Sequence, residues 1–254
     1  MDLRDKATVS ALIITYNEEN KIEDCLKELQ WVDEIIVVDA FSNDRTAEIA
    51  RKYTPKVYQR PWPGFGAQKN FGIHQASSDW ILIVDADELV SPELQREVLE
   101  KLSNPEEDIV GYQIPRWNYL SGKRLKGKSS FPDYQLRFFR KDRGRYNDVE
   151  VHENLIIKGR IGFLKNPLHH FSQRKISDHI NKINLYTTLS MKERAKVKQI
   201  VHWWNFIVNP LVVFLKLYIM KYNFRDGIRG LIISVLDSFS TFSKYTKAWE
   251  RHNR

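Results

Sequence analysis

Cysteine is almost absent from this sequence of 254 residues, and Cys25 is the only one. A single thiol excludes a disulfide framework and a cysteine-rich zinc site, and it favours a reducing compartment. The first ten residues are charged and contain no apolar segment of the kind that a signal peptide needs. We therefore expect the chain to begin and stay in the cytoplasm.

Acidic side chains are scarce in the C-terminal part. Residues 158–254 contain 5 Asp and Glu against 18 Lys and Arg, a net charge of +13, whereas residues 1–157 contain 27 against 22, a net charge of −5. This asymmetry predicts two parts with different tasks: one domain over residues 1–170 and a basic, amphipathic helical region over residues 171–254. The basic region needs an anionic partner, which is either a nucleic acid or an anionic membrane.

Internal repeats are absent, and a composition of 42% hydrophobic and 28% charged residues is that of a globular protein. Within the first 100 residues, short apolar runs alternate with helical patterns. This alternation predicts an α/β fold with a parallel sheet covered on both faces. Shorter strand patterns at 109–115, 134–140 and 155–157 predict a mixed extension of the sheet. The expected strands of the parallel part are 9–14, 34–38, 57–58 and 80–84, and the expected helices are 18–30, 43–53, 68–75 and 92–102.

Two aspartates, Asp85 and Asp87, follow the apolar strand that ends at Val84. In parallel sheets, ligands bind outside the carboxyl ends of the strands. Two carboxylates one residue apart in a tight turn can face one divalent cation, and hard oxygen ligands suit Mg²⁺ or Mn²⁺. The alternative is an exposed acidic turn without a ligand. The apolar strand before the turn favours the functional interpretation.

Other polar side chains also stand at strand ends or helix starts. Asp39 ends the second strand, where a carboxylate can bind a base edge or a ribose, whereas Asp44 can equally form a structural turn with Thr46. Lys69 follows a loop rich in Pro and Gly and lies near a helix start, where a lysine can pair with phosphate. The alternative for Lys69 is an ordinary surface lysine.

Several short motifs follow one another in a fixed order within residues 8–250. They are 13–19, the strand end at Asp39, 68–70, 85–88, 148–153, 169–172, 182–186 and 244–250. Together these motifs resemble family-2 glycosyltransferases of the GT-A fold, and among them small bacterial enzymes of lipopolysaccharide-core and surface-glycan synthesis. The resemblance implies a nucleotide-sugar donor, usually a UDP-hexose, a divalent metal ion (Mg²⁺ or Mn²⁺), and transfer with inversion.

The resemblance also implies roles for individual residues. It places Asp39 at the base, Asp85 near the ribose and the metal, and Asp87 at the metal. His170 is a further candidate metal ligand, with a packed histidine as the alternative. The remaining candidates for donor binding are Thr15, Tyr16, Asn17, Glu18, Gln68, Lys69, Lys182 and Tyr186.

The motif that should contain the catalytic base departs from the family pattern. Inverting transfer needs a carboxylate that accepts the proton of the acceptor hydroxyl, and the family position implies Glu153. Here the pair reads His152-Glu153 in place of Glu-Asp, and Asp148 and Glu150 are competing candidates. Downstream, Lys182 and Tyr186 are spaced to share a helical face, where they either contact the diphosphate or only pack.

The tail has a membrane-like composition. Residues 199–215 contain no charged side chain, but the run is shorter than a spanning helix and contains Pro210. From Ile228 to Phe242, apolar residues recur at helical spacing and form an amphipathic stripe. With the basic charge and several Trp and Tyr, this pattern predicts an interfacial membrane region. The alternative is a helical subdomain or a homo-oligomer interface that buries the same stripe.

These features favour a metal-dependent hexosyltransferase that is peripheral on the inner face of the cell membrane. The expected acceptor is a lipid-linked glycan or a lipopolysaccharide core. Alternatives of related chemistry are a transferase that loads a polyprenyl phosphate or a protein, and a nucleotidyltransferase that releases pyrophosphate. A nucleic-acid-binding module explains the basic charge, but the apolar tail argues against it, because such a surface keeps basic residues dense among the aromatic ones.

Overall fold

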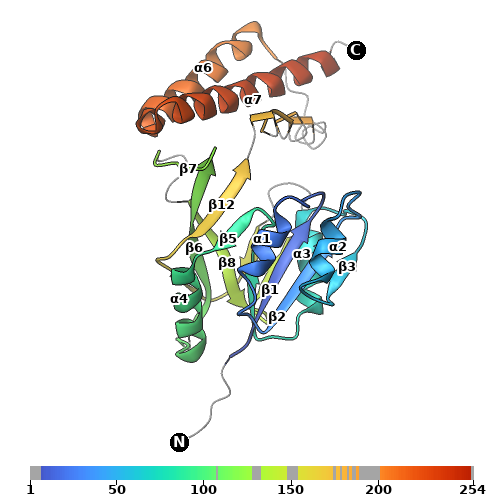
Figure 1. Cartoon of the computed structure of the whole chain (residues 1–254). Helices are drawn as coiled ribbons and strands as arrows, with labels where there is room; N and C mark the ends of the chain where they lie inside the picture. The colour runs from blue at the N-terminus through green and yellow to red at the C-terminus, as the bar shows by residue number, and fades with distance from the viewer. Residues whose placement is uncertain are drawn as a thin grey trace, which may run out of the picture. The chain divides into compact units, whose positions relative to one another are not determined.

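The structure is a computed structural model, and the chain forms two compact units (Figure 1). The first unit comprises Met1–Arg116 and Tyr134–His170, and the second comprises Trp117–Asp133 and Phe171–Arg254. Residues 117–133 thus belong to the second unit, and the expected domains over residues 1–170 and 171–254 stay a prediction. The residues that the structure describes are 7–106, 108–127, 133–147, 154–173, 176–177, 179–181, 183–184, 187–188 and 201–252.

The first unit contains a parallel sheet with the strand order β3-β2-β1-β4. The strands are β1 (Val9–Thr15), β2 (Glu34–Asp39), β3 (Val57–Gln59) and β4 (Trp80–Ile83). Nearly every residue of β1, β2 and β4 is buried, which explains their continuous apolar sequence. The expected α/β fold with a parallel sheet is confirmed, and the carboxyl ends of these strands lie at one edge of it.

Beyond β4 the sheet becomes mixed, as the shorter strand patterns predict. From β4 the order continues with β8, β6, β12 and β5, and β4 pairs with β8 in the antiparallel sense. β7 and β11 also pair with β6, whereas β9 and β10 form a separate two-stranded sheet. The bounds are β5 (Glu88–Val90), β6 (Ile109–Leu120), β7 (Lys123–Arg124), β8 (Asp133–Arg140), β9 (Gly144–Tyr146), β10 (Leu155–Ile157), β11 (Arg160–Phe163) and β12 (Leu168–Gln173).

Helices cover both faces of the parallel part. Successive strand residues point to opposite faces, so Ala11 and Ile13 belong to one hydrophobic core and Leu12 to another. The first core contains residues of α1, α2 and α4, and the second contains Ile73 of α3. The helices are α1 (Ile22–Lys27), α2 (Thr46–Arg51), α3 (Phe65–Gln75) and α4 (Pro92–Ser103).

The helices after β1 and β2 begin later than the sequence patterns predict. The helix expected to begin at residue 43, where Ser42 or Asn43 would cap it, begins at Thr46 instead, and the Thr46 N–H donates to Asp44 Oδ1 at 3.0 Å. Ser42 and Asn43 instead bind the loop after β1: Asn17 N–H donates to Ser42 Oγ, and Asn43 N–H donates to Asn17 Oδ1, both at 2.8 Å. Tertiary contacts between two loops therefore replace the local cap.

The C-terminal part of the second unit is helical. Pro210 lies in the first turn of α6, where its missing N–H is not needed. A turn at Ile207 separates α6 from the preceding η1. The helical segment Trp203–Met220 has 18 residues and a mean hydropathy of 1.4, enough to cross a membrane by length and composition alone. Most of residues 175–198, in the region expected to be basic and helical, lie outside the described residues. The elements are η1 (Trp203–Phe206), α6 (Val208–Leu215), η2 (Lys216–Met220), η3 (Asn223–Asp226) and α7 (Ile228–His252).

Contacts near the start of α7 explain why residues 117–133 belong to the second unit. Asp226 accepts hydrogen bonds from the backbone N–H groups of Lys126 and Gly127 at 2.7 and 2.8 Å. Arg229 Nε donates to the carbonyl of Leu120 at 3.2 Å. The backbone of Lys126 and Gly127, directly after β7, is thus bound to the helical part.

Candidate active site

Two loops at the carboxyl ends of β1 and β2 are joined by hydrogen bonds. Ala40 N–H donates to the Thr15 carbonyl at 2.9 Å, and Glu18 N–H donates to Thr46 Oγ1 at 2.8 Å. Asn17 has a positive φ of 54°, and its backbone and side chain both bind the opposite loop. The predicted donor-binding residues from Thr15 to Glu18 therefore lie together on a stiff surface at the strand ends. Tyr16 leaves half of its surface (52%) exposed there.

Asp39 lies at this edge, but its carboxylate is fully buried. It accepts hydrogen bonds from Ser42 N–H and Ser42 Oγ at 3.0 and 2.5 Å, and from Gln59 Nε2 at 3.0 Å. These bonds hold the loop after β2 and connect it to β3. The role that the structure gives to Asp39 is to shape the loop, and direct contact with a base stays a prediction.

Asp44 forms a structural turn with Thr46, which is one of the two roles that its sequence position allows. Its carboxylate accepts hydrogen bonds from Thr46 N–H and Oγ1 at 3.0 and 2.5 Å, and from Glu19 N–H at 3.2 Å. Partial burial raises the pKa of Asp44, but these hydrogen bonds outweigh it, so the pKa lies below its usual value. An acceptor with these partners stabilises the two loops and has little capacity left for a ligand.

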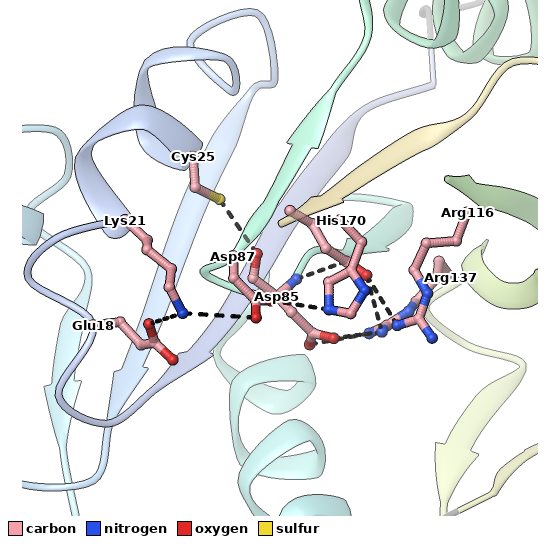
Figure 2. Close-up of polar contacts among 9 residues, drawn as sticks. Glu18, Lys21, Cys25, Asp85, Asp87, Arg116, Arg137 and His170 are labelled. Carbon is pink, nitrogen blue, oxygen red and sulfur yellow. Dashed lines mark hydrogen bonds and ion pairs between the residues drawn. The ribbon is translucent and has the colours of Figure 1, made fainter. Parts of the chain in front are cut away.

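The turn between β4 and β5 carries Asp85 into a buried cluster of charges (Figure 2). Arg137 of β8 donates to both carboxylate oxygens of Asp85 at 3.2 and 2.5 Å and lies 3.6 Å from Glu88. Arg116 of β6 lies 3.4 Å from the same Glu88 oxygen. The turn closes on itself, because Asp85 N–H donates to Glu88 Oε2 at 3.0 Å. The Cys25 thiol donates to the Asp85 carbonyl at 3.6 Å, and burial raises the pKa of this thiol.

The cluster shifts two carboxyl groups in opposite directions. Partial burial raises the pKa of Asp85, but the charges of Arg137 and Lys69 lower it more strongly, so it lies below its usual value. Glu88 is 0% exposed, and burial holds its pKa above the usual value despite the nearby Arg137. Asp85 is therefore the ionised partner of Arg137, and Glu88 is the carboxyl group that is harder to ionise.

Asp87 lies between a lysine and a histidine. Its Oδ2 is 3.9 Å from Lys21 Nζ, and its Oδ1 is 3.5 Å from His170 Nε2 (Figure 2). Lys21 also pairs with Glu18 at 2.9 Å. The antiparallel pairing of β12 with β5, in which His170 is opposite Glu88, brings the histidine to this place. The sequence separated His170 from Asp87 by more than eighty residues, and the structure joins them.

Asp87 and His170 fit a divalent ion as two of its protein ligands. A carboxylate oxygen and a neutral imidazole nitrogen are both ligands that Mn²⁺ accepts. The Asp85 carboxylate binds Arg137, and its expected place on the metal stays a prediction. Within the described ranges, no group of three or more His, Cys, Asp and Glu gathers around one point. Phosphate oxygens and water would have to supply the rest of the shell.

Two buried polar side chains, Thr15 at the end of β1 and Gln68 in α3, have no hydrogen-bond partner within the described part of the chain. Among the residues that the structure describes, none reaches Thr15 Oγ1 or either amide atom of Gln68. Thr15 is 4% and Gln68 0% exposed, and buried polar groups without a partner are rare. A ligand or water that supplies these bonds is the simplest explanation, and both residues are predicted donor contacts.

Lys69 is not the surface lysine of the alternative interpretation. It is only 5% exposed, and its Nζ lies 4.9 Å from the ring centroid of Tyr146. The neighbouring Asn70 holds Tyr146 in place, because its side chain donates to the Tyr146 carbonyl and accepts from the Tyr146 N–H, both at 2.9 Å. Since its charge lowers the pKa of Asp85, Lys69 adds positive potential where a phosphate is expected.

Comparison with known proteins decides the family. The chain matches the model described as glycosyl transferase family 2 over residues 10–159. It is 31% identical to the lipopolysaccharide core biosynthesis glycosyltransferase LpsC of Rhizobium meliloti (strain 1021), over 97% of this chain and 94% of the relative. The chain belongs to glycosyl transferase family 2. The family-2 chain is also 29% identical to an uncharacterised glycosyltransferase of Rickettsia typhi, over 95% of this chain and 87% of that one.

A solved structure has the same architecture as this family-2 chain. TarS of S. aureus, residues 1–349 in complex with UDP, superposes with a TM-score of 0.51 at 16% identity, over 96% of this chain and 92% of that TarS chain. At this identity the likeness concerns the fold, and it agrees with the GT-A expectation. The resemblance that the motifs carry is confirmed.

Part of the family pattern lies outside the described residues. This part comprises Glu153 with its competitors Asp148 and Glu150, the neighbouring His152, and Lys182 and Tyr186. Their roles as proton acceptor and as diphosphate contacts stay predictions.

Two residues of the site escaped the sequence analysis. Lys21 has a local signal, because it stands three residues after Glu18 at a helix start, where side chains at this spacing meet. Arg137 has a weaker signal: it is a charged residue beside the buried Phe138 and Phe139 in a strand. Such a charge needs a buried partner, but nothing in the sequence says that this partner is Asp85.

Proposed function

We propose that this chain is a metal-dependent, inverting hexosyltransferase that transfers a hexose from a UDP-sugar. The observation that carries the proposal is the group formed by Asp87, His170 and Lys21. The buried polar atoms of Thr15 and Gln68, which have no hydrogen-bond partner among the described residues, add to it. UDP and UDP-GlcNAc complexes of TarS, which shares the fold, support a UDP-sugar as donor. The positive charges of Lys21 and the buried Lys69 suit a diphosphate. The unsatisfied polar atoms of Thr15 and Gln68 suit a ribose or a sugar.

We assign different roles in the transfer to the charged residues of the site. Asp87 and His170 would hold the divalent ion, which would supply positive charge near the diphosphate leaving group. Lys21 and Lys69 add fixed positive charge around the same group, which favours the charge that develops as the sugar leaves. Arg137 holds Asp85 in one orientation, so the turn that carries Asp87 is in place before the donor binds.

Glu153 is our proposed base. The acceptor hydroxyl oxygen forms a bond to the anomeric carbon on the face opposite the diphosphate, and its proton passes to the Glu153 carboxylate. The bond between the anomeric carbon and the diphosphate oxygen breaks, and its electron pair leaves with the UDP. One displacement of this kind inverts the anomeric configuration.

We propose a lipid-linked glycan or a lipopolysaccharide core as the acceptor, reached at the cytoplasmic face of the membrane. The name of the relative LpsC supports this acceptor class. The apolar segment Trp203–Met220, none of which is buried, supports membrane contact, as do seven Lys and Arg against three Asp and Glu in residues 201–252. A polyprenyl phosphate or a protein is the competing acceptor, and the competing use of the tail is a homo-oligomer interface.

The metal and donor assignment is tested by calorimetric titration of UDP into the protein with and without Mn²⁺. Asp87→Asn should lose the Mn²⁺-dependent part of UDP binding and fall at least tenfold in transfer. Asp142→Asn, an exposed carboxylate on the same unit, is the matched control and should behave as wild type. UDP binding by Asp87→Asn that still responds to Mn²⁺ would remove Asp87 from the metal site.

The base assignment is tested by Glu153→Gln, which keeps size and hydrogen bonding but removes the proton acceptor. We expect transfer to fall roughly 10²- to 10⁴-fold with UDP affinity nearly unchanged. Asp148→Asn and Glu150→Gln are the controls. If one of these variants is inactive while Glu153→Gln transfers the sugar normally, the assignment of Glu153 as the base is wrong. The proposed reaction class is then unaffected.

The rival reactions have their own products. A nucleotidyltransferase releases pyrophosphate from a nucleoside triphosphate, whereas a glycosyltransferase releases UDP from a UDP-sugar. Coupled assays for the two products, run on the same preparation, separate these classes. A nucleic-acid module would bind labelled RNA or DNA with strong salt dependence and release neither product.

A further inference from the structure

Phe41, which follows β2, has a conformation that a phenylalanine rarely adopts. Its φ is +57°, in the left-handed region, which is a genuine outlier for a bulky residue. Its ring is also 52% exposed to solvent. A large apolar side chain is therefore disfavoured at this position on two counts, backbone strain and exposure, and glycine would avoid both.

The surrounding loop imposes this conformation. Asp39 accepts hydrogen bonds from the backbone and side chain of Ser42, so the chain on either side of Phe41 is held by one carboxylate. Ala40 N–H is bound to the Thr15 carbonyl, and Ser42 Oγ accepts from Asn17 N–H. Strained residues persist where the surroundings over-determine them, and they cluster at ligand clamps. The strain therefore points to a use for the ring outside the protein's own packing.

A second exposed aromatic ring stands on the facing loop. Tyr16 follows Thr15 and Phe41 follows Ala40, so the two aromatic residues flank the same 2.9 Å hydrogen bond between the loops. Tyr16 is 52% exposed, as Phe41 is. The unpartnered Thr15 Oγ1 lies at this same strand end. Two half-exposed rings beside an unsatisfied polar atom suit a flat ligand with a polar edge.

We propose that Phe41 stacks on the nucleobase of the nucleotide-sugar donor. This inference rests on the proposed function, because it concerns the donor of that reaction. The Asp39 carboxylate is buried and already bound to Ser42 and Gln59, whereas the Phe41 ring is the large apolar surface that this loop exposes to a base. Stacking between bases and aromatic side chains tolerates different bases, because every base has a π face.

Four variants separate stacking from a structural role. Phe41→Gly removes the ring and relaxes the backbone, Phe41→Ala removes the ring and keeps the strain, and Phe41→Tyr keeps both. Ser121→Gly is the matched control, because Ser121 also has a positive φ (+47°) but belongs to the second unit. The measurements are the Kd of UDP by calorimetry in the presence of Mn²⁺, and the Tm without nucleotide.

Stacking predicts that Phe41→Gly and Phe41→Ala bind UDP roughly fivefold to a hundredfold more weakly than wild type. Phe41→Tyr and Ser121→Gly should bind UDP as wild type does. Without nucleotide, the Tm of Phe41→Gly should equal or exceed that of wild type, because the left-handed backbone no longer carries a side chain. A purely structural Phe41 predicts the reverse, a lower Tm for Phe41→Gly with unchanged UDP affinity.

The failure of this inference differs from the failure of the proposed function. If wild type binds UDP and both ring-removing variants bind it equally well, the stacking role is overturned and the donor class stands. If wild type binds none of UDP, GDP, CDP and TDP, the proposed function and this inference are both overturned. If Phe41→Gly and Phe41→Ala bind UDP more weakly but keep the wild-type Tm, the stacking role and the proposed function are both supported.

Discussion

Arg137 supplies positive charge and hydrogen bonds to the acidic groups Asp85 and Glu88 of the site. Its guanidinium donates to both oxygens of Asp85 and lies within 3.6 Å of Glu88, and its side chain is only 8% exposed. A planar fork that matches a carboxylate in this way is not replaced by a lysine without loss. Removal of one partner from a buried ion pair costs more than the pair itself contributes, because the remaining charge loses its counter-charge.

Arg137→Met should therefore lower the free energy of unfolding by about 3–5 kcal/mol. Arg137→Lys should cost less, because it keeps the charge and one hydrogen bond. The measurement is urea unfolding followed by circular dichroism. Arg140→Met, on the same strand and exposed, is the control and should change stability by about 0.5 kcal/mol or less. A loss in Arg137→Met no larger than in this control would contradict the structural role.

The lowered pKa of Asp85 predicts a pH dependence of stability. A carboxyl group whose pKa is lower in the folded protein stabilises the fold above its unfolded pKa of about 3.9, and this contribution is lost as the pH falls through the folded value. Between pH 6 and pH 3, the unfolding free energy of Asp85→Asn should therefore fall less steeply than that of wild type. Asp142→Asn should keep the wild-type slope. Equal slopes for Asp85→Asn and wild type would contradict the assignment.

Among the elements, the start of α7 shows how close packing depends on one glycine. A Cβ at Gly230 would lie 1.8 Å from the backbone oxygen of Asn223, which cannot move as a flexible side chain can. Asn223 is buried and donates from Nδ2 to Ser234 Oγ at 3.1 Å, and Ser234 donates back to the Gly230 carbonyl at 2.7 Å. The turn η3 and the first turns of α7 thus form one packed corner.

Gly230→Ala should destabilise the protein although alanine favours helices. Overpacking costs about 1–3 kcal/mol, whereas the helix propensity of alanine returns about 1 kcal/mol, so we expect a net loss of up to about 2 kcal/mol. Thermal unfolding followed by circular dichroism measures this loss. Ser240→Ala, farther along α7, is the control and should leave the Tm nearly unchanged. A Tm of Gly230→Ala at or above that of wild type would show that the corner relaxes.

For the whole molecule, the two units differ in surface as well as in fold. The first unit carries the strand-end site, and the second presents α6 with Ile207, Leu211 and Leu215 exposed at a spacing of four residues. Lys216 and Lys221 follow this face directly. An apolar helical face beside basic side chains is the arrangement that binds anionic lipid surfaces.

Leu211→Glu should weaken binding to vesicles of anionic lipid, because it places a charge in the apolar face and repels the lipid charge. Ile156→Glu in the first unit, at a residue of similar exposure, is the matched control and should bind as wild type does. Co-sedimentation with vesicles at low and high salt measures the effect, and binding by wild type should fall with salt. Unchanged vesicle binding by Leu211→Glu, with a change of oligomeric state in light scattering, would favour the oligomer interface.

The sequence by itself determined the alternation of strands and helices, the two aspartates at the end of β4, and the family. Those features are local or ordered along the chain, so periodicity and motif order reveal them. Only the tertiary structure decided which side chains meet. Asp85 meets Arg137 because β8 lies beside β4, Asp87 meets His170 because β12 pairs with β5, and Asp39 turns inward because Ser42 and Gln59 bind it. The register of distant strands sets these contacts, and no spacing within one segment encodes that register.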